Sequence, residues 1–322
     1  MDGRRIVVVG YHAAELLDIA CVTSAFAAAN VRARRPHYDT VLATPGGAPI
    51  TCGSGLTLRG QCALERVTGP LDTLIVSGGL GHEEAAADAR LVGDVRRLAR
   101  ESRRVASVCT GATVLAATGL LDGRRATTHW SFAERLASRH PAVTVDPDPI
   151  FIRDGAVSTA AGVMSALDLT LAFIAEDHGP AFARDIARHL VTYLQRPGNQ
   201  AQMSIHTAPA PVGDGVVDGV VEHIVAHLHE DLTAASLAAL AGVSERHLTR
   251  LFRRHTGLTP GRYVRRARTE AAAHLLSGTA LPLPSIAVRC GFKTPETLRQ
   301  AFTDRYGLSP SRYRHTQSPP ED

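Results

Sequence analysis

The C-terminal part of the chain contains two segments that repeat each other at an offset of 50 residues. Seven residues of the first segment recur 50 positions later: Leu248, Phe252, Gly257, Leu258, Pro260, Arg262 and Tyr263 return as Leu298, Phe302, Gly307, Leu308, Pro310, Arg312 and Tyr313. Self-similarity at one period indicates one structural unit used twice. The spacing of the apolar residues in each copy predicts a helix, a tight turn and a second helix.

In the first copy, an apolar stretch over residues 237–241 ends at Gly242, and Ser244 is placed to cap the next helix. That helix carries its apolar residues on one face, which predicts burial against its neighbours. The opposite face is polar and basic, and it carries Arg246, Thr249, Arg250 and Arg253.

The second copy has one residue more in its turn. Thr294 is the expected cap, and Pro295 lies just inside the helix, where a missing amide hydrogen costs nothing. The polar face of this helix carries Glu296, Arg299 and Gln300.

The charge of this region favours a nucleic-acid partner over a merely solvated helix face. Residues 237–314 contain 14 Lys and Arg against 4 Asp and Glu, a balance of +10 (14 − 4), whereas the whole chain carries +4. Everything outside this window therefore sums to −6 (4 − 10). A basic module on a mildly acidic body is typical of a nucleic-acid-binding domain.

Residues 216–314 resemble the paired helix-turn-helix domain of AraC/XylS-type transcription regulators. The resemblance rests on Gly291-Phe292, Leu298, Phe302, Gly307-Leu308-Ser309-Pro310 and Tyr313-Arg314. It implies that double-stranded DNA is the partner. It also implies that Arg246, Thr249 and Arg250 face one major groove, beside Arg253 on the same helix, and that Glu296, Arg299 and Gln300 face the next groove, roughly 34 Å away. These side chains suit the task, because Arg reads guanine, Gln reads adenine and Glu accepts from cytosine.

The length and punctuation of the chain predict two domains. At 322 residues it is too long for one typical domain. Prolines and glycines interrupt any periodicity over residues 203–219, which predicts a linker there. We therefore expect one compact domain over 1–202, the DNA-binding domain over 220–315 and a flexible polar tail over 316–322.

Strand-like and helix-like patterns alternate in residues 1–202. Short β-branched runs at 5–10, 38–43, 72–77 and 104–108 are separated by helix-forming stretches. This alternation predicts an α/β domain with a mostly parallel sheet and helices on both faces, followed by an all-α C-terminal domain with two helix-turn-helix motifs. Ligands of such sheets collect at the carboxyl ends of the strands.

Cys109 lies at one of these strand ends, on the turn into a predicted helix. A Cys at this place projects into the crevice, and the helix N-terminus is expected to lower the pKa of its thiol. The alternative is an inert, buried thiol, since unpaired Cys most often packs as a small hydrophobic residue.

Residues 1–202 resemble a PfpI-type domain of the class I glutamine amidotransferase-like superfamily. The resemblance rests on Asp18, on Ser77-Gly78-Gly79, on Cys109-Thr110-Gly111 and on Thr127-Thr128-His129-Trp130. It implies that Cys109 is an elbow nucleophile, His129 its partner and Asp18 an acid near the thiol. It also implies a ligand site at Gly78, Gly79 and Thr110, with amides near Gly79 and Thr110 forming an oxyanion hole. The chain departs from the family pattern at Cys21-Val22, where Gly-Pro is common.

The fusion of the two domains resembles GlxA-like regulators, in which the amidotransferase-like domain serves for sensing and dimerisation. It implies a transcription regulator controlled by an unidentified small-molecule effector, a homodimer through the N-terminal domain, and RNA polymerase as a candidate partner. The alternative is a cysteine-dependent amidase or an isonitrile-hydratase-like enzyme that carries a DNA-binding domain. Only Cys109, Asp18 and His129 support that alternative, so we favour a regulator without turnover.

The remaining sequence features carry little functional signal. The 15 His are scattered and no Cys pair has zinc-site spacing, so we expect neither a metal nor another cofactor. The five Cys are odd in number and unpatterned, which indicates reduced thiols. No signal sequence or membrane span is evident, and we expect a cytoplasmic protein.

Overall fold

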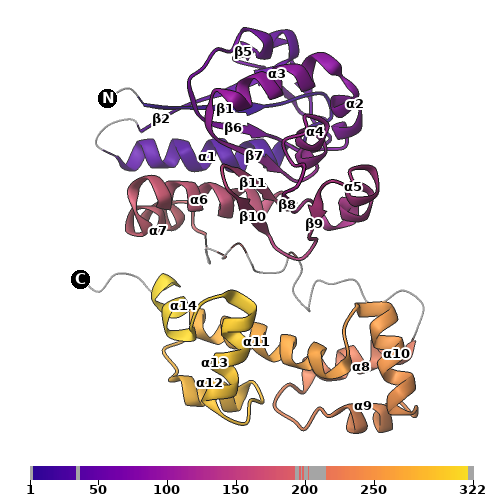
Figure 1. The fold of residues 1–322 in the computed structure, drawn as a ribbon. Coiled ribbons are helices and arrows are strands. Elements are labelled where there is room, and N and C mark those ends of the chain that lie inside the picture. Colours follow the sequence, from indigo (N-terminus) through magenta and orange to yellow (C-terminus); the bar gives the residue numbers. More distant parts are fainter. Residues whose placement is uncertain are drawn as a thin grey trace. The chain divides into compact units, whose positions relative to one another are not determined.

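The computed structural model describes residues 3–33, 37–192, 196, 198, 202 and 215–317, except for the side chains of 277–278 and 315–317. The chain divides into two compact units, residues 1–202 and 203–322, drawn from indigo to rose and from orange to yellow in Figure 1. The predicted linker covers residues 203–219, of which 203–214 lie outside the described residues. Its predicted C-terminal boundary is wrong, because helix α8 begins at Gly215. Val217 and Val220 are buried there, and this apolar spacing favours helix despite the two nearby glycines. The predicted tail begins too early, since α14 continues to Gln317; residues 318–322 are not described.

The N-terminal unit is built on a seven-stranded sheet in the order β10-β11-β7-β6-β1-β2-β5. Its strands are β1 (Arg4–Val9), β2 (Tyr38–Thr44), β5 (Cys62–Ala63), β6 (Leu71–Val76), β7 (Ser102–Val108), β10 (Phe151–Asp154) and β11 (Val157–Ala160). All neighbours pair in parallel except β10 and β11. Two further pairs of two-residue strands are β3 (Ile50–Thr51) with β4 (Thr57–Leu58) and β8 (Arg125–Ala126) with β9 (Thr144–Val145).

Helices cover both faces of this sheet (Figure 1). One group consists of α1 (Leu16–Arg32), α6 (Met164–His178) and α7 (Pro180–His189). The other group consists of α2 (His82–Ala87), α3 (Ala89–Arg100) and α4 (Gly111–Ala117), and α5 (Ala133–Arg139) follows η3 (Trp130–Phe132). Two more short turns of 3₁₀ helix are η1 (Pro45–Gly47) and η2 (Leu64–Arg66). The predicted α/β class is confirmed.

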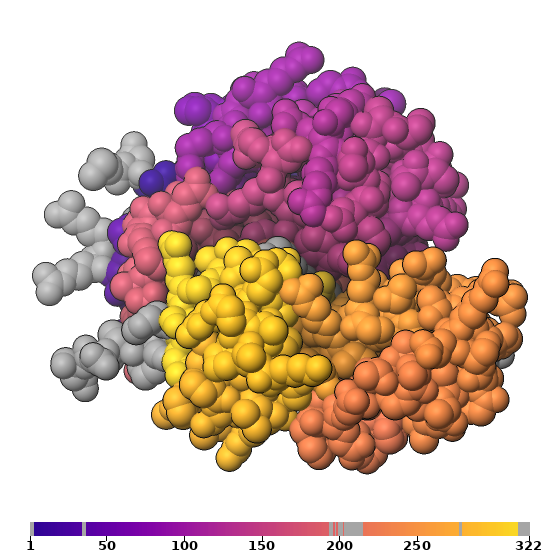
Figure 2. All heavy atoms as spheres, turned by 60° about the horizontal axis from the view of Figure 1, so that its bottom comes forward, coloured from indigo at the N-terminus to yellow at the C-terminus, as the bar shows by residue number. Residues whose placement is uncertain are grey.

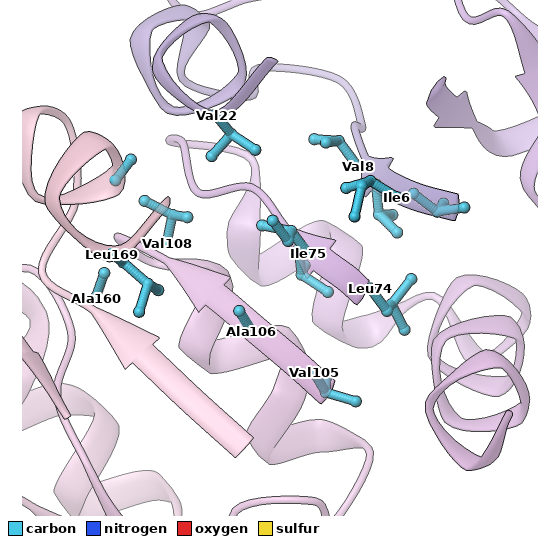
Figure 3. Close-up of a cluster of buried hydrophobic side chains, with 14 of the residues drawn as sticks. Ile6, Val8, Val22, Leu74, Ile75, Val105, Ala106, Val108, Ala160 and Leu169 are labelled. Carbon is cyan, nitrogen blue, oxygen red and sulfur yellow. The ribbon is translucent and has the colours of Figure 1, made fainter. Parts of the chain in front are cut away.

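The central strands are apolar on both faces because helices lie on both sides. Figure 3 shows this core, in which side chains of β1, β6 and β7 meet those of α1 and α6, among them Ile6, Val8, Ile75, Val108, Val22 and Leu169. The continuous apolar runs of the sequence thus become buried strands, and polar groups are left for the strand ends.

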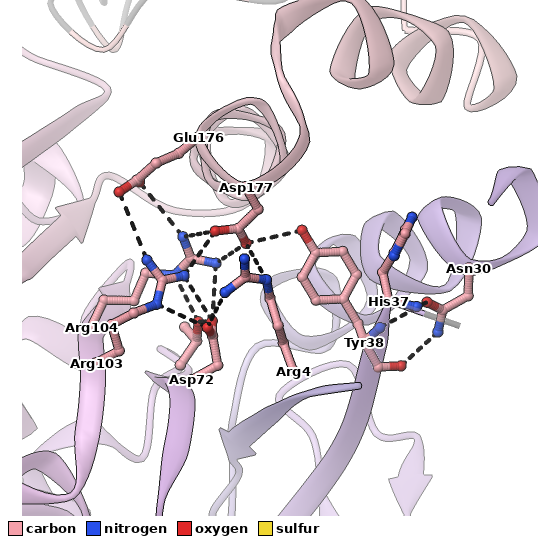
Figure 4. A network of polar contacts seen from close by, with 10 residues as sticks. Arg4, Asn30, His37, Tyr38, Asp72, Arg103, Arg104, Glu176 and Asp177 are labelled. Carbon is pink, nitrogen blue, oxygen red and sulfur yellow. Dashed lines mark hydrogen bonds and ion pairs between the residues drawn. The ribbon is translucent and has the colours of Figure 1, made fainter. Parts of the chain in front are cut away.

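Charged side chains close the edge of the sheet at which β1, β6 and β7 begin (Figure 4). The buried Arg104 guanidinium lies 2.6 Å from Asp177 of α6 and 3.2 Å from Asp72 of β6. Arg103 contacts the same two carboxylates, and the hydroxyl of Tyr38 donates to Asp177. Burial and the charge of Asp177 raise the pKa of Tyr38. This network ties the end of α6 to the strand starts, opposite the strand ends where Cys109 lies.

The C-terminal unit is helical, as predicted. It contains α8 (Gly215–Ala226), α9 (Ala234–Leu240), α10 (Glu245–Thr256), α11 (Pro260–Gly278), α12 (Leu283–Arg289), α13 (Pro295–Tyr306) and α14 (Pro310–Gln317). One core joins α8, α9, α10 and the start of α11, and a second joins the end of α11 to α12, α13 and α14. The long α11 therefore belongs to both halves (Figure 1). Within the described residues, no helix is both long and apolar enough to cross a membrane.

The two copies of the repeat have matching boundaries. Ser244 and Thr294 cap α10 and α13 with their hydroxyls, as the sequence predicts. Both helices end at a glycine with positive φ, Gly257 and Gly307. The repeat in the sequence is thus a repeat in the structure.

Candidate ligand site and nucleic-acid interface

Cys109 occupies a strained turn between β7 and α4. Its φ is +54°, a left-handed conformation that costs a non-glycine residue about 1 to 3 kcal/mol. Its amide donates to the Ala160 carbonyl at 2.9 Å, which fixes the turn against β11. Val163, which immediately precedes α6, is also left-handed, with φ of +48°. Strain of this kind gathers at functional sites.

Two glycines enclose the Cys109 side chain. A Cβ on Gly78 or on Gly162 would lie 2.5 Å from the Cβ of Cys109, closer than real atoms approach. Any larger residue at either position would displace the elbow. The thiol residue is consequently only 7% exposed.

Asp18 lies beside this pair, at the start of α1, and is 1% exposed. One carboxylate oxygen accepts from the Gly78 amide at 3.0 Å and the other accepts from the Val163 amide at 2.7 Å. Burial raises the pKa of Asp18 from 3.8 to about 7, although both hydrogen bonds act to lower it. The acid can therefore hold or release a proton near neutral pH.

The predicted activation of the Cys109 thiol is wrong. Burial and the negative charge of Asp18 raise its pKa from 9.0 to about 12. A helix N-terminus contributes about 0.3 to 1 kcal/mol, less than one pKa unit. Burial of an ionisable group shifts a pKa by up to about 3 to 5 units. The larger effect decides, and the thiol stays protonated.

Of the two amides predicted to form an oxyanion hole, near Gly79 and Thr110, the Gly79 amide and its neighbour at Gly78 already have partners. The Gly79 amide donates to the Thr110 hydroxyl at 2.9 Å, and that hydroxyl donates back to the Gly79 carbonyl at 2.8 Å. The Gly78 amide is held by Asp18. A ligand oxygen would have to displace a side-chain oxygen to reach either amide.

His129 has a partner other than Cys109. Its Nδ1 lies 2.8 Å from the Ser131 hydroxyl, and burial lowers the pKa of its ring. Within the described residues, no hydrogen bond joins His129 to Cys109. The neighbouring Thr128 instead donates its hydroxyl to the Cys109 carbonyl at 2.9 Å. The structure thus brings Asp18, Gly78, Gly79 and Thr110 to the thiol, while His129 lies in the adjoining loop.

The sequence interpretation missed Tyr11, Gly162 and Val163. Tyr11 is buried at the end of β1 and donates its hydroxyl to the Ser77 carbonyl at 2.8 Å. Burial, Asp18 and Cys109 together raise its pKa, which places it in the same site. A Tyr directly after a strand was a usable signal, because strand ends collect site residues. Nothing local in the sequence indicated that Val163 would hold Asp18.

The polar face of α10 forms a shallow hollow of about 670 Å³. All four residues predicted on this face line it, together with Ser244, Glu245 and His247: Arg246, Thr249, Arg250 and Arg253. Within the described residues no carboxylate pairs with Arg246, Arg250 or Arg253. A further side chain, His247, lies 3.0 Å from the Arg250 guanidinium through its Nδ1 and was not predicted. This face can therefore contact phosphates and base edges with free cations.

The polar face of α13 is exposed but its charges are paired. Arg299 donates to Glu296 at 2.8 Å, and Gln300 donates to Asp304 at 2.7 Å. Arg265 of α11 also reaches Asp304, at 2.6 Å. Figure 2 shows the surface of this unit, with the first copy in orange and the second in yellow. The polar faces of α10 and α13 therefore differ, because the charges of α13 are paired, whereas the arginines of α10 have no carboxylate partner among the described residues.

The described residues contain no group of three or more His, Cys, Asp or Glu that could hold a metal ion. His223 and His227 stack with ring centroids 4.3 Å apart on α8.

Comparison with known proteins accounts for both units. Residues 4–176 match the DJ-1/PfpI family, and residues 237–316 match a helix-turn-helix domain. The chain is 32% identical over 305 residues to the HTH-type transcriptional regulator GlxA of Rhizobium meliloti, covering 93% of this chain and 92% of that protein. The chain belongs to this family of transcriptional regulators. It carries the DJ-1/PfpI domain and the AraC-type helix-turn-helix domain of that family, and it binds DNA.

Two further relatives are similar to part of the regulator. The crystal structure of a THiJ/PfpI family protein from Pseudomonas syringae superposes with a TM-score of 0.57 at 25% identity, covering 75% of this chain and 92% of that one. The isonitrile hydratase of Pseudomonas putida is 31% identical over 185 residues, 58% of this chain and 73% of that enzyme. The likeness to the enzyme covers only part of this chain.

Proposed function

We propose that the regulator is controlled by a small molecule that binds at the Cys109 site of the N-terminal unit. The observation that carries this proposal is the combination of a strained elbow with a protonated thiol and with the Gly78 and Gly79 amides already hydrogen-bonded. A nucleophile needs a thiolate, and acyl transfer needs free amides for the developing charge. A binding site needs neither.

The surroundings of the site suggest the chemistry of the effector. Four exposed apolar residues are sequence neighbours of Asp18, Gly79, His129 and Val163: Leu17, Leu80, Trp130 and Met164. The charges that act on Cys109 come from Asp18 and Glu15, and both are acidic. We therefore expect an effector with an apolar part and without an anionic group near the thiol.

Genomic footprinting with and without a panel of metabolites tests this proposal. The expected result is a set of sites whose protection changes with one class of compound. Cys109→Ser should fold, bind DNA without the compound as the wild type does, and differ in its response. Protection that no compound changes, at effector levels that saturate a direct binding assay, would contradict control by this site.

The second candidate is a cysteine-dependent hydrolase or hydratase, favoured by the elbow geometry of Cys109 and by the likeness to isonitrile hydratase. Purified protein should then convert amides or isonitriles with turnover that Cys109→Ser and Asp18→Asn each abolish. We expect no such turnover, because the thiolate is scarce.

We further propose that the regulator acts in the cytoplasm as a homodimer formed through α1 and contacts RNA polymerase at its promoters. Leu17, Ser24 and Val31 are exposed at seven-residue intervals along α1, and such a stripe suits a second copy of the helix. Val31→Asp should then shift the sedimentation coefficient from that of a dimer to that of a monomer.

In vitro transcription with purified RNA polymerase tests the proposed contact between the regulator and that enzyme.

A further inference from the structure

The last residue of the N-terminal unit is fastened to the loop beside Cys109. Gln202 directly precedes residues 203–214, which lead in the sequence to α8 of the C-terminal unit. The side-chain amide of Gln202 donates to the Thr128 carbonyl and to the Pro147 carbonyl, each at 2.7 Å. Its side-chain oxygen accepts from the Trp130 amide at 2.9 Å. Both N–H groups of this side-chain amide and its oxygen therefore have backbone partners.

Thr128 connects this fastening to the elbow. It is completely buried, and its hydroxyl donates to the carbonyl of Cys109 at 2.9 Å while its own carbonyl accepts from Gln202. One residue thus separates the Cys109 peptide from the end of the unit. A movement of the elbow that displaced Thr128 would therefore act on the hydrogen bond between the Thr128 carbonyl and Gln202.

A second connection runs through α6. Asp18 holds the Val163 amide immediately before this helix, and the buried Asp168 within it binds Arg196 through the backbone amide and the guanidinium, at 2.9 Å each. Arg196 lies six residues before Gln202. Both groups that define the site, the acid and the thiol residue, are therefore connected to described residues near the end of the N-terminal unit, Arg196 and Gln202.

We propose that Gln202 is the positioning residue that couples the Cys109 site to DNA binding, by holding the end of the N-terminal unit to the Thr128–Trp130 loop. This inference rests on the proposed control of DNA binding by the Cys109 site. A glutamine that only stabilised the loop would make the same contacts. The test must therefore measure how a change at the Cys109 site alters DNA affinity, and not protein stability alone.

The chain supplies both a perturbation and a reporter. Gly162→Ala places a Cβ 2.5 Å from the Cβ of Cys109, which is too close, so the turn at Cys109 has to shift. Trp130, the single tryptophan, has its amide held by Gln202, so its fluorescence reports the loop. DNA affinity is measured on a duplex recovered by selection from random sequences, with the full chain.

In the wild-type background, Gly162→Ala should shift Trp130 fluorescence and change DNA affinity by about fivefold or more, a typical coupling between sites. In the Gln202→Ala background, the same change should leave DNA affinity within about twofold of Gln202→Ala alone. Gln61→Ala is the matched control, because the Gln61 side chain also accepts from a backbone amide, that of Leu42. Both residues are far along the chain from Cys109 and from Gln202. Gln61→Ala should leave the response to Gly162→Ala intact.

The outcomes separate the two proposals. A change in DNA affinity that persists in full in the Gln202→Ala background overturns the role of Gln202 and leaves control by the Cys109 site standing. A fluorescence shift without any change in DNA affinity in the wild-type background overturns both. If circular dichroism shows that Gly162→Ala does not fold, Thr128→Val replaces it as the perturbation, since it removes only the hydroxyl that reaches Cys109. The same pattern of results is then required.

Discussion

Cys109 has the backbone position of a cysteine nucleophile but a protonated side chain. The elbow gives it the position of a nucleophile, while burial and Asp18 keep its proton in place. The sequence predicted the turn and the neighbours Asp18, Gly78, Gly79 and Thr110. It could not predict the protonation state, because burial depends on Gly162 and Val163, which arrive from a strand end more than 50 residues further along the chain.

We expect Cys109 to react slowly with iodoacetamide. With a pKa raised from 9.0 to about 12, the thiol supplies roughly a thousandfold less thiolate at neutral pH than an ordinary cysteine. Peptide mapping by mass spectrometry should find it alkylated after the half-buried Cys21. Asp18→Asn removes the negative charge and should accelerate its alkylation. Cys109 labelling first among the five cysteines would contradict the protonated site.

Asp18 should make the stability of the N-terminal unit depend on pH. Its folded pKa of about 7 lies above the ordinary 3.8, so the folded state holds this proton more tightly than the unfolded state. The resulting stability is present below pH 4 and is lost as the pH rises to 7, with a slope of up to about 1.4 kcal/mol per pH unit. Urea unfolding followed by Trp130 fluorescence measures it, since that residue lies in this unit.

Asp18→Asn is the control for this slope. Because asparagine cannot ionise, the free energy of unfolding of this variant should vary less between pH 4 and 7. The variant should be less stable at every pH, since the side-chain NH2 group then faces one of the two backbone N–H groups. Equal slopes in the two proteins would show that Asp18 does not titrate in this range.

At the scale of elements, the repeat in the sequence correctly predicted helices α10 and α13 and their caps. The pattern sufficed because capping and amphipathic spacing are local properties. It could not predict that Glu296 pairs with Arg299 while Arg250 faces His247, because rotamers decide these contacts. The start of α8 was missed for a related reason: two glycines suggested a linker, and the burial of Val217 and Val220 outweighs them.

Substitutions in the two helices should have separable effects. Arg250→Ala and Arg299→Ala should each remove base readout in a different half-site, at about 1 to 3 kcal/mol for a lost bidentate pair. Arg299 must leave Glu296 to reach a base, so its substitution should cost less than that of Arg250. Selection from random duplexes should show the two losses about one helical turn apart. Loss at the same base pairs would exclude docking in two grooves.

At the scale of the whole molecule, DNA affinity should reside in residues 215–317. Binding releases counterions, so the logarithm of affinity should fall with the logarithm of salt concentration by about 0.9 per phosphate contact. Arg253→Ala should reduce this slope by about one contact, whereas Arg139→Ala, an exposed arginine of the N-terminal unit, should leave it unchanged. A fragment of residues 1–202 that binds duplex DNA as tightly as the full chain would contradict this division.

The unequal free charge of α10 and α13 bears on how the regulator finds its operator. Long-range attraction accelerates encounter, whereas short-range fit governs how long a complex lasts. We expect the arginines of α10 to hold any duplex while the protein slides along it. Since Arg299 and Gln300 of α13 must exchange their internal partners for bases, we expect this helix to add little to that attraction. Search speed and residence time should then be set by different helices, and changing the second half-site of a promoter should alter how long the regulator stays there without changing how quickly it is found.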